Sequence, residues 1–183
     1  EGASTCCGSK ITIQTPSATQ LILAKSVGTA AEFAPGRVIC GLGAGWLREE
    51  FEAVGQDFAT RGPRLDEMLD VLPLLWSGEV VEYHGQHIDF APLRMLPSAG
   101  RVPVLIGGNT APALRRAARG DGWIGNYTHL DDVTRMVDQL ADNRERSDRA
   151  HTNFEILLTA NPGVAREAAA LEDVGVDGLV VAA

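Results

Sequence analysis

The chain has 183 residues, of which 45% are hydrophobic, and it carries a formal net charge of −8. That length is enough for one sizeable hydrophobic core, whereas the negative charge disfavours binding to the phosphate backbone of nucleic acids. No apolar run reaches the roughly 18 residues that a membrane-spanning helix needs, so we expect no membrane protein.

The cysteines and histidines give no sign of a disulfide framework or a metal site. Three cysteines make an odd count without a Cys-x-x-Cys pair, and this pattern is typical of the reducing cytoplasm. The first ten residues lack the charged and apolar regions of a secretory signal, so we do not expect them to be one. His84 and His87 lie in the segment EYHGQHIDF, which predicts a β-hairpin with a solvated turn.

Strand-like and helical segments alternate along the chain. Short runs rich in Val and Ile predict strands, and apolar residues at three- and four-residue spacing predict helices. In chain order we expect strand 9–14, helix 20–33, strand 37–42, helix 63–76, strand 102–106, helix 111–119, strand 122–125, helix 131–146, strand 154–159, helix 164–173 and strand 178–181. This alternation predicts a parallel α/β fold, either an open doubly wound sheet or part of an eight-stranded barrel, which typically needs about 250 residues.

The segment 47–101 interrupts the alternation. It contains two helical stretches, the predicted hairpin VVEYHGQHIDF and the proline-containing stretch PLRMLPSAGRVP. Long excursions between strands are where α/β folds carry lids and substrate walls. Because neither a linker composition nor an internal repeat marks a boundary, residues 1–183 are predicted to form one domain, or part of one.

The glycine-rich stretch CGLGAGW, residues 40–46, follows a predicted strand. It is not a dinucleotide fingerprint, because Trp46 stands where G-x-G-x-x-G requires its third glycine, and no Walker pattern follows. Two interpretations remain open. The glycines mark the exit of a strand packed against another backbone, or they leave room for a flat ligand at the strand's carboxyl end. Glu49 and Glu50 then either face that cavity or complement the dipole of the next helix.

A second glycine-bearing strand end occurs in VLIGGNTAPALRRAARG. The predicted strand ends at Gly107 and Gly108, Asn109 or Thr110 can cap the following helix, and Pro112 suits its first turn. Unpaired N–H groups at such a turn favour a phosphate. An ordinary capped helix after a tight turn explains the spacing equally well.

No nucleophilic triad is indicated, since the chain has no G-x-S-x-G and no cysteine near a histidine in a known arrangement. A phosphate-binding barrel lyase or isomerase would need a lysine or carboxylate at a strand end, and no good candidate is present.

At this point the chain resembles the luciferase-like monooxygenase superfamily, particularly its coenzyme F420-dependent oxidoreductases. Members typically read G-R-hydrophobic-G-hydrophobic-G-x-G-W, then E-F-x-x-x-G, F-x-x-R-x-x-R-x-x-E and L-x-x-L-W. The matching residues are Gly36-Arg37, Gly41 to Trp46, Glu50-Phe51, Gly55, Phe58, Arg61, Arg64, Glu67 and Leu72 to Trp76. The segments MLP, PVLIGGNTAPALRRAARG and DGW are similar to later motifs of the family, so the resemblance covers nearly the whole chain.

The resemblance implies a TIM-barrel-like parallel fold lacking about the first two strand–helix units, with a flavin or F420 at the carboxyl ends of the strands. The implied cofactor contacts are Ser9, Lys10, Gly43, Ala44, Gly45, Trp46, Gly107, Gly108, Asn109 and Thr110. Trp46 and Asn126 are the predicted substrate contacts. Lys10 departs from the family's G-T-x-V pattern, and Trp46 stands where some F420 enzymes carry a proton-donating Glu, so no catalytic acid is assigned.

The sequence therefore predicts an F420-dependent luciferase-like oxidoreductase that moves a hydride between C5 of the deazaflavin and a small organic substrate, with FMN as the alternative cofactor. A sheet that lacks two barrel units exposes strand edges, which predicts a homodimer. The alternative is a flavin- or F420-binding protein without turnover, or a truncated barrel that completes itself by dimerising.

Overall fold

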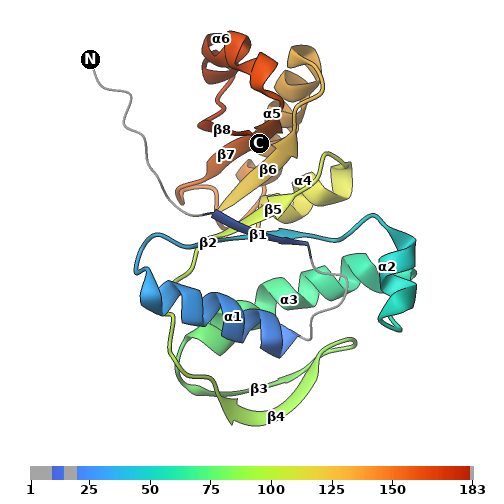
Figure 1. The fold of residues 1–183 in the computed structure, drawn as a ribbon, viewed down its shortest axis with the longest axis vertical. Coiled ribbons are helices and arrows are strands. Elements are labelled where there is room, and N and C mark those ends of the chain that lie inside the picture. The colour runs from blue at the N-terminus through green and yellow to red at the C-terminus, as the bar shows by residue number, and fades with distance from the viewer. Residues whose placement is uncertain (1–9, 15–19, 182–183) are drawn as a thin grey trace. The chain divides into compact units, whose positions relative to one another are not determined.

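The computed structural model describes residues 10–14 and 20–181 of the chain (Figure 1). Backbone contacts divide the chain into two compact units. The first unit contains residues up to 40 together with 44–102, and the second unit contains residues 41–43 and 103–183. Strand β2 (Ile39–Gly43) is therefore shared, with its last three residues in the second unit.

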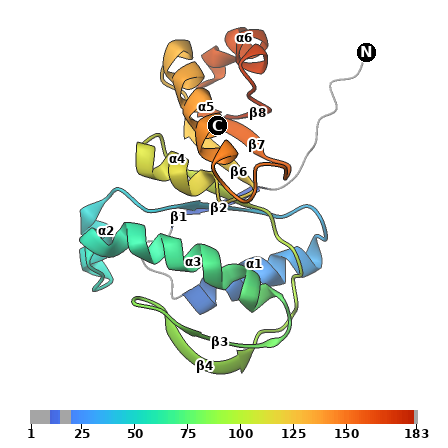
Figure 2. The same cartoon turned by 180° about the vertical axis from the view of Figure 1, so that it is seen from behind.

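Two long helices form the centre of the first unit. Helices α1 (Gln20–Phe33) and α3 (Arg61–Trp76) lie side by side in both views (Figures 1 and 2). Apolar residues at helical spacing are buried on both, including Leu23 and Val27 on α1, which is the pattern of an amphipathic helix. The indole Nε1 of Trp76 donates to the carbonyl oxygen of Ala24 at 3.0 Å, so the two helices are also joined by a buried hydrogen bond.

A β-hairpin is attached to α3 through one carboxylate. Strand β3 (Val80–His84) pairs antiparallel with β4 (Asp89–Arg94), as the sequence predicts. Glu67 of α3 accepts hydrogen bonds of 2.7–3.1 Å from the backbone N–H groups of the hairpin loop, namely those of Gln86, His87 and Ile88. The glutamate of the family pattern therefore holds this loop in place.

The segment before α3 is organised around Phe58. The 3-10 helix η1 (Phe58–Thr60) carries the Phe58 ring, and two guanidinium groups lie over it. Arg61, the first residue of α3, is 3.8 Å from the ring centroid, and Arg48 of helix α2 (Arg48–Ala53) is 4.6 Å from it. Such stacking of cations on an aromatic face is attractive. The Phe and Arg of the family pattern are thus packing residues of the first unit.

The second unit is an alternation of parallel strands and helices. The strands are β5 (Val104–Gly107), β6 (Gly122–Asn126), β7 (Glu155–Ala160) and β8 (Gly178–Val181). The helices are α4 (Ala111–Ala117), α5 (Leu130–Glu145) and α6 (Ala168–Asp173), the last preceded by the 3-10 helix η2 (Pro162–Glu167). The sheet order is β1-β2-β5-β6-β7-β8, where β1 is Lys10–Gln14, and the pairs from β5 to β8 are parallel. The predicted parallel α/β fold is confirmed.

An Asp-Gly pair begins both β6 and β8. Asp121 Oδ2 accepts from the N–H of Val104 on β5 at 2.9 Å, and Asp177 Oδ2 accepts from the N–H of Ile156 on β7 at 2.7 Å. A Cβ at Gly122 would lie 2.3 Å from the carbonyl oxygen of Glu155, a distance that no side chain tolerates, so glycine is required there. Each aspartate therefore extends the pairing with the preceding strand by one hydrogen bond.

Arginines surround the first of these aspartates. Arg149 forms an ion pair with Asp121 at 2.5 Å, and Arg144, only 8% exposed, donates to the carbonyl oxygens of Arg149 and Thr152. The Arg144 guanidinium also lies 4.5 Å from the ring centroid of Phe154. Burial, and then the charge of Arg149, lowers the pKa of Arg144, while Asp121 acts in the opposite direction.

The helix predicted over 164–173 is only partly α-helical in the structure. The sequence predicts a helix over 164–173, but the chain forms η2 first and is α-helical only from Ala168. Gly163 disfavours α-helical geometry in this first turn, whereas Pro162 suits the start of a helix. Among the described residues no helix is long and apolar enough to cross a membrane.

Candidate cofactor site at the carboxyl ends of the strands

The loop that follows β5 is tied to β6 at three points. The N–H of Gly108 donates to the carbonyl oxygen of Ile124 at 3.1 Å, and the indole Nε1 of Trp123 donates to the carbonyl oxygen of Gly108 at 2.8 Å. The side-chain amide of Asn109 donates to the carbonyl oxygen of Asn126 at 2.7 Å and accepts from the Asn126 N–H at 2.9 Å. The loop conformation is therefore set by the neighbouring strand.

Glycines let this loop approach its neighbours. Gly108 has φ +115°, a conformation that other residues rarely adopt. A Cβ at Gly107 would touch the carbonyl oxygen of Leu42 on β2, at 3.5 Å. A Cβ at Gly125 would lie 2.3 Å from the Trp123 ring, so that glycine makes room for the indole.

The predicted side-chain cap of α4 is absent. Thr110 is the N-cap residue by backbone geometry and Pro112 lies in the first turn, as expected, but the Thr110 side chain makes no capping hydrogen bond. Asn109 cannot cap the helix because both polar atoms of its amide are bonded to Asn126. In the part of the chain that the structure describes, the N–H groups of Asn109 and Thr110 donate to no protein acceptor. Their hydrogens are thus available to an anion.

The carboxyl end of β2 is less closely packed than the loop that follows β5. A Cβ at Gly43, the last residue of β2, would meet no atom of the described residues within 4 Å. Gly45 follows with φ +82°, and Trp46 is 73% exposed. Helix α2 then begins at Arg48, with Glu49 and Glu50 exposed in its first turn, where acids complement the helix dipole.

The predicted site residues fall in both units. Gly43, Gly107 to Thr110 and Asn126 lie in the second unit, whereas Lys10, Ala44, Gly45 and Trp46 lie in the first, and Ser9 lies outside the described residues. Within the second unit the structure brings Gly43, Gly107, Asn109 and Asn126 together, since a Cβ at Gly107 would be 3.9 Å from Gly43 Cα. Their roles toward a cofactor stay predictions.

Two polar residues at these strand ends are not among the predicted ones. Tyr127, directly after β6, donates from Oη to a carboxylate oxygen of Glu167 in η2 at 2.5 Å, and its N–H donates to the carbonyl oxygen of Thr159. The hydrogen bond to Glu167 raises the pKa of Tyr127. Because the two residues are 40 positions apart, no local pattern in the sequence indicates the pair.

The side chains near the site do not form a metal centre or a reactive thiol. Among the described residues no cluster of three or more His, Cys, Asp or Glu side chains could hold a metal ion. Burial raises the pKa of Cys40, in β2, to about 12, so its thiol stays protonated and unreactive. The arrangement offers backbone N–H groups and open space, which suits binding of a flat, anionic group.

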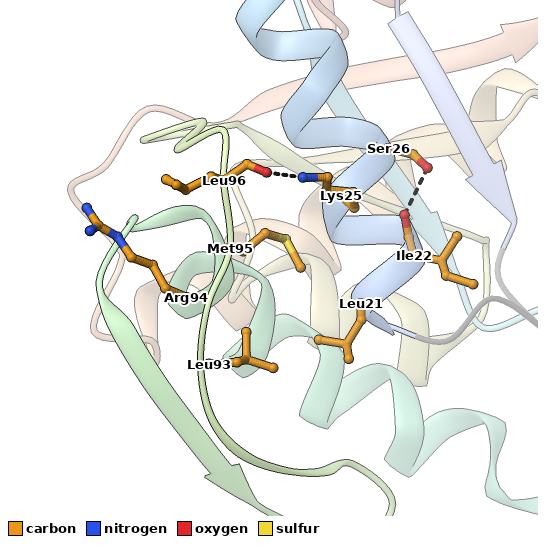
Figure 3. Close-up of a pocket in the computed structure, with 8 residues that line it drawn as sticks. All are labelled: Leu21, Ile22, Lys25, Ser26, Leu93, Arg94, Met95 and Leu96. Atoms are coloured by element: carbon orange, nitrogen blue, oxygen red, sulfur yellow. Dashed lines mark hydrogen bonds between the residues drawn. The ribbon is translucent and has the colours of Figure 1, made fainter.

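A separate groove lies in the first unit and contains none of the predicted site residues (Figure 3). It has a volume of about 420 Å³ and lies between α1 and the end of β4 with the two residues that follow. Its lining residues are Leu21, Ile22, Lys25, Ser26 and 93–96. Lys25 closes part of it by donating to the carbonyl oxygen of Leu96. The lining is mostly apolar and presents none of the glycine-rich backbone of the strand ends.

Comparison with known proteins identifies the family. The model of the luciferase-like monooxygenase family matches residues 12–180. The chain belongs to this family. The match includes both glycine-bearing strand ends described above, and it confirms the predicted family.

Three similar proteins illustrate the range of the family. An uncharacterized Mycobacterium tuberculosis protein, Rv0940c, is 33% identical over 162 residues, covering 87% of this chain and 56% of that protein. The FMNH2-dependent dimethylsulfone monooxygenase of Pseudomonas fluorescens is 27% identical, covering 76% of this chain and 39% of that protein. The coenzyme F420-dependent tetrahydromethanopterin reductase of Methanopyrus kandleri has a similar structure, with a TM-score of 0.66 at 16% identity, covering 91% and 60% of the two chains. The chain thus spans about half the length of the curated relatives it matches.

Proposed function

We propose that this chain is part of an F420-dependent oxidoreductase that transfers a hydride to or from a small organic substrate, with FMN as the alternative cofactor. Membership of the luciferase-like family supports an oxidoreductase or monooxygenase. A structural neighbour that depends on F420 and a relative that depends on FMNH2 support a flavin-type cofactor of either kind.

The residues at the strand ends fit such a cofactor. The Asn109 and Thr110 N–H groups are suitable donors for its phosphate, and the loop Gly107 to Thr110 contains no carboxylate that would repel it. Gly43 leaves the end of β2 open for a flat ring. The open side of Gly43 beside the tied loop is the observation that carries the proposal.

The proposed cofactor contacts are Ser9, Lys10, Gly43 to Trp46 and Gly107 to Thr110, and the proposed substrate contacts are Trp46 and Asn126. When bound, the deazaflavin or flavin supplies the hydride chemistry. The task of the protein is to bind and orient the two reactants and to keep them close. No residue is assigned as a proton donor.

Titration of the purified protein with F420 and with FMN tests the proposal. We expect saturable binding of one of them, detected through the change in cofactor fluorescence. Binding of neither cofactor at concentrations up to about 1 mM, which corresponds to a binding free energy of only about −4 kcal/mol, would contradict the proposal.

A second candidate is a cofactor-binding homodimer without turnover. It is favoured by the position of β8, which is the last strand in the sheet order and carries the partly exposed Val180. Unpaired strand edges recruit other strands. Sedimentation at several protein concentrations distinguishes a dimer from a monomer, and an assay of cofactor reduction with candidate alcohols as substrates distinguishes binding from turnover.

A further inference from the structure

The indole of Trp123 lies beneath the loop that follows β5. Its side chain is 0% exposed, and its Nε1 donates to the carbonyl oxygen of Gly108 at 2.8 Å. Two residues further along β6, Gly125 provides the space for the ring, since a Cβ there would overlap it at 2.3 Å. Trp123 and Gly125 therefore act together to bring one N–H donor to Gly108.

The hydrogen bond to Gly108 also fixes the next N–H group. The carbonyl of Gly108 and the N–H of Asn109 belong to the same peptide unit, and in a trans peptide the two bonds point in opposite directions. The only cis peptide bond in the described chain joins Leu96 and Pro97. Because the Gly108 carbonyl is directed at the buried indole, the Asn109 N–H is directed away from it.

We infer that Trp123 is a positioning residue for the phosphate of the cofactor, which it does not itself contact. Its N–H orients the Gly108–Asn109 peptide so that the Asn109 N–H is presented to the ligand. The Asn109 side chain fixes the other side of the loop through its two hydrogen bonds to Asn126. This inference rests on the proposed function, because it requires a phosphorylated cofactor at this loop.

The variant Trp123→Phe tests the inference, because it keeps an aromatic ring and removes the N–H. The probes are two pairs of compounds, in each of which one member carries the phosphate and the other does not. The pairs are FMN with riboflavin, and F420 with its deazaflavin core without the phosphate and the groups attached to it. For the pair that the wild-type protein binds, we expect the phosphorylated member to bind about tenfold more weakly to the variant, as for the loss of one hydrogen bond. Binding of the phosphate-free member should be unchanged.

Trp76→Phe is the matched control. Trp76 is equally buried, and its Nε1 also donates to a backbone carbonyl, that of Ala24 at 3.0 Å in the first unit. Both variants should lower Tm, but Trp76→Phe should leave the ratio of the two affinities at its wild-type value. A second variant, Asn109→Ala, changes a half-buried side chain and should also weaken binding of the phosphorylated member relative to the phosphate-free member. This variant provides the test if Trp123→Phe does not fold.

The outcomes separate the inference from the proposed function. Equal weakening of both members of the pair, or an unchanged ratio in Trp123→Phe and Asn109→Ala, overturns the inference while leaving the function intact. If the wild-type protein binds none of the four probes, the proposed function is rejected and the inference with it.

Discussion

The two ends of the strands in the second unit are built from different chemistry. At the amino ends, Asp121 and Asp177 accept hydrogen bonds from the preceding strands, and arginines pack around Asp121. At the carboxyl ends, Gly43 and Gly107 replace side chains with backbone and space. In parallel α/β barrels the carboxyl ends hold the active site, whereas the amino ends contribute stability. Substitutions at the two ends should therefore affect different measurements.

The largest effect is expected at an amino end. Asp121→Ala removes the acceptor for the Val104 N–H and the partner of Arg149, and it leaves the buried Arg144 beside an uncompensated charge. Breaking such a pair costs about 3 kcal/mol in the free energy of unfolding. Urea denaturation measures this loss. Cofactor affinity should be unchanged under conditions where the variant is folded. A loss of affinity without a loss of stability would contradict the assignment of the amino ends to stability and of the carboxyl ends to binding.

The opposite result is expected at a carboxyl end. Gly43→Val places an isopropyl group at the end of β2, where a Cβ meets no atom of the described residues within 4 Å and where a β-branched residue suits a strand. We expect cofactor affinity to fall at least about tenfold, or about 1.4 kcal/mol, while the unfolding midpoint changes little. Gly163→Val is the matched control, because a Cβ at Gly163 likewise has no neighbour within 4 Å in the part of the chain that the structure describes. Unaltered affinity in Gly43→Val would make this glycine a packing feature only.

A smaller loss of stability is expected at the other amino end. It distinguishes the contribution of the backbone hydrogen bond from that of the ion pair. Asp177 accepts from the Ile156 N–H as Asp121 does from Val104, but it is exposed and no ion pair to it is seen among the described residues. Asp177→Ala should therefore lower the free energy of unfolding by only about 1 kcal/mol. A loss as large as that of Asp121→Ala in the same urea experiment would show that the arginines contribute little.

The smallest effect is a pH dependence at the start of α5. Hydrogen bonds from Arg135 and Thr128 hold the pKa of Asp132 below its ordinary value of 3.8. A depressed pKa means that the carboxylate stabilises the folded state above pH 3.8 and that this contribution is lost as pH falls through the lower, folded-state pKa. The urea midpoints of wild type and Asp132→Asn should differ slightly above pH 3.8 and converge as the pH falls through the lower pKa of the folded state. A constant difference across that range would contradict the assignment.

Much of the fold could be predicted because the relevant signals are local. Helix 20–33 and strand 178–181 have the predicted bounds, and the hairpin lies around Gly85 and Gln86 as expected. The helix predicted at 164–173 is preceded by η2, which begins at Pro162, and the chain is α-helical only from Ala168. Periodicity indicates which face is buried, but not which helical geometry the first turn adopts.

The sequence predicts which glycines form the candidate site, but it does not predict which side chains hold their loop in place. Glycines at strand ends are visible in the sequence, and they lie where the structure needs positive φ or open space. The bonds that fix them join residues far apart, 17 positions for Asn109 and Asn126 and 15 for Trp123 and Gly108. Asn109 is a predicted cofactor contact; because its side chain is bonded to Asn126 on β6, we expect that contact through its N–H.

The paired Asp-Gly starts of β6 and β8 also bear on how the second unit folds. Each aspartate reaches back only to the strand before it, over 17 residues from Val104 to Asp121 and 21 from Ile156 to Asp177. Closing loops of this size costs little more entropy than closing shorter ones, and short-range contacts favour rapid folding. Each strand–helix–strand segment is thus closed by contacts that are short in sequence, and the pairing of β6 with β7 joins the two segments.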